Sequence, residues 1–67
     1  MAGNNLKTTL EQEGIMQIEL SHQCNVSIGT INRACNQKRT PSATIRHRII
    51  KAINRIAGKT YQHDDIF

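Results

Sequence analysis

The feature that most constrains the fold is a row of apolar residues between positions 43 and 57. Isoleucine or alanine recurs there every three or four residues with basic residues in between, the apolar positions being Ile45, Ile49, Ala52, Ile53 and Ile56. This spacing lays one apolar face along a helix. We therefore predict a helix over residues 43–57 that supplies much of the core, with Thr40 or Ser42 as its N-cap and Gly58 at its end.

Shorter segments before this row have the same helical spacing. Two leucines four residues apart predict a first helix over residues 6–13. Asn4 or Asn5 is expected to cap its start, and Gly14 is expected to end it. The polar residues 1–5 are expected to be disordered.

Two further helices are predicted over residues 16–24 and 27–36, with a tight turn between them. Asn25 suits the left-handed conformation that stops a helix, Val26 is expected to be buried in the turn, and Ser27 is a good N-cap. The second of these helices has only a thin apolar stripe, formed by Ile31, Ala34 and Cys35. A helix, a tight turn and another helix make a helix-turn-helix.

The length of 67 residues allows one small domain over residues 1–67. One Phe, one Tyr and no Trp leave the ten isoleucines, with other aliphatic residues, to build the core. No alternating apolar pattern of useful strand length appears. We predict an all-α fold of four to five short helices, in which a final turn brings Ile66 and Phe67 onto the core.

The charge of the chain is unevenly distributed. The formal net charge is +4, and the segment from Arg33 to Lys59 contains eight basic residues and no acidic one. Four of the five acidic residues lie near the two ends of the chain. This distribution favours a polyanionic partner, although a solvated basic surface is the alternative.

Several classes of function find no support in the sequence. No apolar run approaches the ~20 residues that span a bilayer, and no signal-peptide pattern is present, so a cytoplasmic protein is expected. Cys24 and Cys35 lack metal-ligand spacing and are expected to be reduced and packed as small apolar residues. His22, His47 and His63 are dispersed. We expect no metal, no cofactor, no small-molecule ligand and no enzymatic activity.

The residues around the predicted turn resemble a known family. The stretch GIMQIELSHQCNVSIGTINRACNQKRTPS resembles the helix-turn-helix of the phage-repressor and Cro-type regulators, the XRE family, in which a Gln opens the first helix of the motif and "VS" opens the second. The preceding helix and the terminal DDIF also look like that family. VSIGTINRACNQ followed by SATIRHRIIKAI is similar to the headpiece of the lac-repressor family. The helix before the motif, and the lack of a ligand-binding domain, favour the phage-repressor resemblance.

Three positions depart from the pattern of the phage-repressor family. Met16 stands where Thr or Ser usually caps the first helix of the motif, Ser21 where Ala is common, and Asn25 where Gly is common. Ser21 is small and Asn25 tolerates the left-handed conformation, so both preserve the geometry. The missing cap at Met16 is expected to cost about 1 kcal/mol of helix stability.

The resemblance implies a lambda-repressor-like bundle that binds double-stranded DNA as a transcriptional regulator, most simply a repressor. The helix at 27–36 would enter the major groove with its first residues facing base edges, and the expected base contacts are Ile28, Gly29, Thr30, Asn32 and Arg33. The Arg33 guanidinium can pair with guanine O6 and N7, a phosphate contact or a free surface side chain being the alternatives. Ile28 could contact only a thymine methyl group or exclude water, unless it is partly buried.

The expected phosphate contacts come from both helices of the motif and from the segment that follows, and they are Gln17, Ser27, Asn36, Lys38 and Arg39. Such contacts position a protein without specifying sequence. Ser27 is foremost a cap, and the others could equally be solvated. A homodimer on palindromic DNA is a functional expectation, for which part of the isoleucine row or the terminal Ile66 and Phe67 could form the surface.

An interaction module that keeps this fold but binds protein, such as an antitoxin or an adaptor, is the alternative function. The weak hydrogen-bonding capacity of Ile28 and Gly29 supports it. The acid-free basic segment and Arg33 argue against it.

Overall fold

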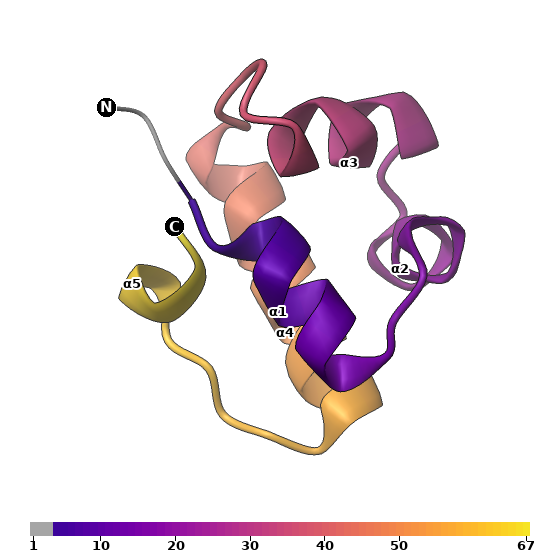
Figure 1. Cartoon of the computed structure of the whole chain (residues 1–67), viewed down its shortest axis with the longest axis vertical. Coiled ribbons are helices and arrows are strands. Elements are labelled where there is room, and N and C mark those ends of the chain that lie inside the picture. The colour runs from indigo at the N-terminus through magenta and orange to yellow at the C-terminus, as the bar shows by residue number, and fades with distance from the viewer. Residues whose placement is uncertain (1–3) are drawn as a thin grey trace.

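The computed structural model of the chain describes residues 4–67. This part of the chain is all-α, as predicted, and contains no strand. Its five helices are shown in Figure 1 and are α1 (Leu6–Glu13), α2 (Gln17–Cys24), α3 (Ile28–Cys35), α4 (Ala43–Ala57) and α5 (His63–Ile66). α4 packs against both α2 and α5, and α3 lies across one end of the molecule, where it packs on α2 and α1.

The start of the described chain is tied to segments far away in the sequence. The side chain of Asn4 caps α1 by accepting from the Leu6 N–H at 3.0 Å, whereas Asn5 makes no such bond. The Asn5 N–H donates to the Ile66 carbonyl at 2.7 Å. Of the residues expected to be disordered, 1–3 lie outside the described residues, and the two asparagines are hydrogen-bonded.

The turn between α2 and α3 has the predicted geometry. Asn25 adopts the left-handed conformation with φ 56° and ψ 42°, which ends α2, and Val26 is buried behind it. Ser27 Oγ then accepts from the Thr30 N–H at 3.2 Å and caps α3. α2 itself begins at Gln17, one residue later than predicted, because Met16 has an extended backbone and occupies the N-cap position, where its side chain makes no cap bond.

The long central helix has the predicted bounds. Ser42 Oγ accepts from the Ile45 N–H at 3.4 Å, so Ser42 rather than Thr40 is its N-cap. Gly58 ends the helix with a left-handed φ of 67°. A glycine suits that position because it has no Cβ to clash.

The core is aliphatic, as the composition indicates. Its largest fully buried side chains come from α1, α2, α3, α4 and α5, and they are Leu6, Leu20, Ile31, Ile49, Ile53 and Ile66. Ile45 and Ile56 of the predicted row are only partly buried, whereas Ile50, which lies outside the row, is buried. The buried face of α4 is therefore wider than the spacing of its apolar residues predicts, because neighbouring helices cover α4 from more than one side.

A polar cluster joins the end of α1 to the segment between α4 and α5. Lys59 Nζ donates to Glu13 Oε2 at 2.6 Å, and the Tyr61 hydroxyl donates to the same carboxylate oxygen. These two bonds lower the pKa of Glu13, and the same contacts raise the pKa values of Lys59 and Tyr61. Only 10% of the Glu13 side chain is exposed. The cluster ties segments that are more than forty residues apart in the chain.

Candidate nucleic-acid interface

α3 is anchored by one face and exposed on the other. Ile31, Ala34 and Cys35 are buried against the rest of the bundle, which confirms the thin apolar stripe predicted for this helix. The residues expected to face the bases are exposed or half-buried on the remaining surface. This arrangement gives a helix that is rigidly held and still open to a partner along its length.

The exposed face of α3 is bordered on one side by the start of α2. The Asn32 side-chain amide donates to Gln17 Oε1 at 3.4 Å, and it accepts from Asn36 Nδ2 at 3.1 Å. Three of the predicted contact residues are thus joined in one chain of amides. One N–H and one acceptor site of the Asn32 amide are used in these bonds, and a second N–H and a second acceptor site remain for a partner.

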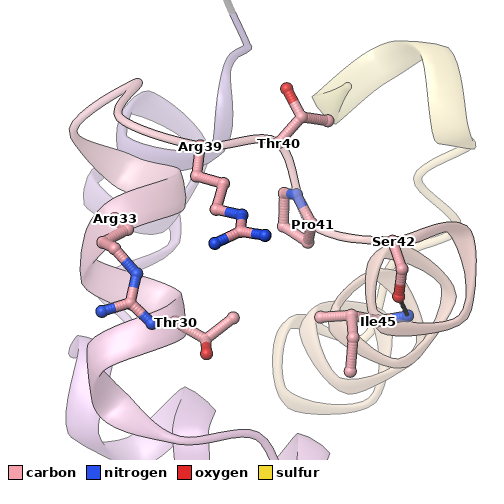
Figure 2. A pocket seen from close by; sticks show the side chains of 7 residues that line it. All are labelled: Thr30, Arg33, Arg39, Thr40, Pro41, Ser42 and Ile45. Carbon is pink, nitrogen blue, oxygen red and sulfur yellow. Dashed lines mark hydrogen bonds between the residues drawn. The ribbon is translucent and has the colours of Figure 1, made fainter.

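On the other side of α3 lies a groove that ends at the start of α4. It has a volume of about 420 Å³ and is lined by Thr30, Arg33, Arg39, Thr40, Pro41, Ser42 and Ile45. Figure 2 shows Arg39 pointing into the space between α3 and α4, with Arg33 at its α3 border. The lining includes two arginines and three hydroxyl residues, and the groove ends where the 15-residue helix α4 begins, at an N-terminus whose N–H groups and dipole favour an anion.

Arg33 is the predicted base contact with the most unused hydrogen-bonding capacity. It is exposed, and its side chain has no hydrogen-bond or ion-pair partner among residues 4–67. The side chain extends toward the start of α3, so that Nη1 lies 3.5 Å from the position that a Cβ on Gly29 would occupy. Arginine has five N–H donors in a planar fork, and none of those of Arg33 is used within residues 4–67.

The connection between α3 and α4 is held at both of its ends. Near its start, the Gln37 side chain accepts from the Asn4 N–H at 2.9 Å and donates to the Asn4 carbonyl at 3.0 Å. Near its end, Arg46 donates to the Pro41 carbonyl at 2.6 Å and to His63 Nε2 at 3.1 Å. These contacts fix the backbone that carries Lys38 and Arg39, whose side chains are exposed.

Apolar side chains are also exposed beside α3. Met16, Ile18 and Ile28 are 68%, 47% and 43% exposed, and the last two line a shallow hollow between α2 and the start of α3. Ile28 is therefore on the surface, whereas partial burial was the alternative expected from the sequence. An apolar group at this place can contact only the apolar part of a partner.

The groove includes residues that sequence reasoning did not select as contacts. From the sequence, Thr40 and Ser42 are expected only as caps and Ile45 only as a core residue, whereas all three line the groove. The signal was present in the order KRTPS, where two basic and two hydroxyl residues precede a helix start. The predicted contacts Lys38 and Asn36 do not line this groove, and both are exposed.

A second set of basic residues lies along the exposed side of α4. Arg48, Lys51 and Arg55 are exposed and form no ion pair within the described part of the chain. α4 begins beside α3 and runs away from it (Figure 1), so these charges extend the positive field beyond the groove. Cys24 and Cys35 are buried, and burial raises the pKa of each thiol.

Comparison of the chain with protein-family models, with curated proteins and with solved structures gives no match. None of the helices within residues 4–67 combines the length and the apolar character that a membrane crossing requires.

Proposed function

We propose that the protein is a sequence-specific double-stranded DNA-binding regulator of transcription that inserts α3 into the major groove. The observation that carries this proposal is the exposed face of α3, on which the guanidinium of Arg33 has no hydrogen-bond or ion-pair partner among residues 4–67. An α-helix fits the major groove, where each base pair presents a distinct pattern of donors and acceptors.

The elements on both sides of α3 could contact the phosphates that border the DNA major groove. Gln17 lies at the start of α2 on one side, and Arg39 and Ser42 lie at the start of α4 on the other. Helix N-termini and guanidinium groups are common partners of phosphate oxygens. These contacts would set the position of α3 on the duplex, and the contacts of α3 itself would supply sequence preference.

Repression would follow from occupancy of the DNA alone. A module of this size covers about 600–1,000 Å², a small footprint that a homodimer on a palindrome would double. Half-sites would then be one helical turn apart. A bound dimer would block the access of polymerase to the promoter.

A protein-binding module such as an antitoxin or an adaptor is the second candidate function. The exposed apolar residues Met16, Ile18 and Ile28 favour it. A surface of this kind, next to α3, would suit an apolar helix of a partner protein. The basic residues of α3, of the connection and of α4 form no ion pair within residues 4–67, and they favour the first candidate.

The dependence of affinity on salt distinguishes the two candidates. If about five phosphates are neutralised, the logarithm of the association constant for duplex DNA should fall with the logarithm of salt concentration at a slope of about −4.5. A slope near zero would contradict the DNA-binding proposal. Protein–protein contacts through an apolar surface are much less sensitive to salt.

Two variants separate base contacts from phosphate contacts. Arg33→Ala should reduce the preference for one base pair, because in the proposed complex its guanidinium contacts a base edge. Lys38→Ala should weaken binding to all sequences about equally and reduce the salt slope by about 1. Both can be measured by titrating a matched and a mismatched duplex. Identical effects of the two variants would remove the role given to Arg33.

A further inference from the structure

Three side-chain amides are joined by hydrogen bonds between α2 and α3. Asn36 Nδ2 donates to Asn32 Oδ1 at 3.1 Å, and Asn32 Nδ2 donates to Gln17 Oε1 at 3.4 Å. Asn32 is exposed on α3, Asn36 is exposed at the C-cap of that helix, and Gln17 is the half-buried first residue of α2. We call these three residues the amide chain. Both of its bonds run in the same direction, so each amide has a defined set of groups left for a partner.

The middle amide of the chain keeps one donor and one acceptor. A carboxamide has two N–H groups and an oxygen with two lone pairs. Asn32 uses one N–H toward Gln17 and one lone pair toward Asn36, so one N–H and one lone pair remain. Asn32 is exposed, so a partner can reach its side chain.

Adenine is the base whose major-groove edge matches one donor and one acceptor. It presents N7 as an acceptor beside the N6 amino group as a donor, and asparagine can pair with both. Guanine presents two acceptors there, so the Asn32 oxygen would face an atom that has no proton to donate. Cytosine presents only a donor and thymine only an acceptor, so each would leave one group of the amide unpaired.

A phosphate at Gln17 would fix the direction of the amide chain. Gln17 accepts from Asn32, so its own N–H groups are not used within the chain. In the proposed complex Gln17 contacts a phosphate, whose oxygens accept hydrogen bonds from protein donors. Gln17 then turns its N–H groups to the phosphate and keeps its oxygen toward Asn32. Asn32 in turn keeps an N–H toward Gln17 and its oxygen toward Asn36, which is the direction observed in the structure.

We propose that Asn32 determines specificity by pairing with N6 and N7 of an adenine, and that Gln17 and Asn36 are positioning residues that hold its amide in the required orientation. The phosphate contact of Gln17 and the base contact of Asn32 are then coupled, because the first sets the orientation that the second needs. This inference rests on the proposed function and adds a base that the site selects.

The first experiment is selection of binding sites from randomised duplexes by the full chain and by its Asn32→Ala variant. The unmodified protein should enrich a site with a required adenine, and Asn32→Ala should lose the preference at that position by about fivefold or more. A variant that keeps the same site, or loses its preference at another base, would overturn the inference and leave the proposed function intact. If the unmodified protein enriches no sequence, the proposed function fails and the inference fails with it.

Changes to the selected adenine test its two hydrogen bonds separately. 7-Deazaadenine lacks the N7 acceptor, and unsubstituted purine lacks the N6 amino group. Each should weaken binding of the unmodified protein about threefold or more, the value of one hydrogen bond. Asn32→Ala should lose this sensitivity to both changes. If the variant is weakened as strongly as the unmodified protein, Asn32 does not contact the adenine and the inference is wrong.

A double-mutant cycle tests the coupling between Gln17 and Asn32. Gln17→Ala should weaken binding to every sequence and should also reduce the discrimination in favour of adenine about threefold or more. In the Asn32→Ala background it should keep only the uniform loss, because no amide is left to position. A uniform loss in both backgrounds would show that Gln17 does not position Asn32, and the inference would fail.

Gln23→Ala is the matched control, because Gln23 is an exposed amide on α2 outside the amide chain. It should leave the discrimination in favour of adenine unchanged, and circular dichroism should show the same helix content in every variant. If Gln23→Ala reduces this discrimination as much as Gln17→Ala does, the amide chain is not its source and the inference is wrong.

Discussion

At the scale of single residues, Gly29 lowers the stability of α3 but would allow the α3 backbone to approach DNA closely. It lies within the first turn of α3 with an ordinary helical backbone, and it therefore does not need the conformational freedom of glycine. Its cost to the helix is about 1 kcal/mol relative to alanine. Because the backbone conformation does not require glycine here, we explain Gly29 by its small size, which lets a partner come close to the α3 backbone.

Gly29→Ala should raise the free energy of unfolding by about 0.5–1 kcal/mol, because the new Cβ would meet Arg33 only at an ordinary contact distance of 3.5 Å. The same variant should bind DNA more weakly, because a methyl group would stand between the α3 backbone and the bases. Urea unfolding and duplex titration measure the two effects.

Gly14→Ala is the control for this prediction. Gly14 has a φ of 68°, where alanine is strained, so this variant should lose stability and should not change the preference for one sequence over another. A Gly29→Ala protein that is stabilised and binds with unchanged affinity would show that α3 does not approach its partner closely.

At the scale of elements, α2 is the helix with the weakest start. α3 and α4 have serine caps, Ser27 and Ser42, whereas the cap position of α2 is occupied by Met16. The backbone of Met16 is extended, with φ −82° and ψ 148°, close to that of both serines. Only the acceptor atom is missing.

Met16→Ser should therefore stabilise the protein by about 0.5–1 kcal/mol by supplying an acceptor to the first N–H groups of α2. Its 68% exposure means that little apolar burial is lost. The midpoint of urea unfolding measures the change. Ser27→Ala, which removes an existing cap, should shift the midpoint by a similar amount in the opposite direction. A midpoint that falls in Met16→Ser would show that the methionine packs on its neighbours more than its exposure indicates.

The elements also show what the sequence could and could not predict. Spacing and caps predicted the helices closely, because the periodicity of α4 and the local chemistry of Asn25, Ser27 and Gly58 act within a few residues. The burial of Ile50 could not be predicted from that periodicity, because it depends on how neighbouring helices cover α4. The candidate contacts on α3 came from the resemblance, and their contact with bases is still a prediction. The groove lined by Thr40 and Ser42 could not be predicted, because it depends on how the connection between α3 and α4 folds back toward α3.

At the scale of the whole molecule, the cluster of Glu13, Lys59 and Tyr61 makes stability depend on pH. Glu13 has a lowered pKa in the folded protein, because Lys59 and then Tyr61 hydrogen-bond to its carboxylate. Its contribution is therefore complete above the ordinary carboxyl pKa of 4.5 and is lost as the pH falls through the lowered value. The pKa values of Lys59 and Tyr61 are raised, so their contribution is complete below their ordinary values of 10.5 and 10.0 and is lost at higher pH.

The melting temperature should thus be highest at intermediate pH and should fall toward acid. Glu13→Gln should have a lower melting temperature at neutral pH and a smaller loss toward acid, because the paired carboxylate is gone. Glu11→Gln, the same change on an exposed neighbour of α1, should leave the acid loss unchanged. Thermal unfolding of the three proteins between acid and neutral pH measures these differences, and equal acid loss in all three would exclude Glu13 as its source.

The buried cysteines have a practical consequence for kinetics. Cys24 ends α2 and Cys35 ends α3, and they are the two cysteines of the chain. Both cysteines are buried, so a thiol-reactive dye should react with them mainly when the helices open, and the labelling rate should report the frequency of opening. Each single-cysteine variant then reports on one helix separately. If duplex DNA binds α3 as proposed, it should lower the labelling rate of Cys35 in proportion to the fraction of protein that is bound. The binding could then be measured without a probe on the DNA.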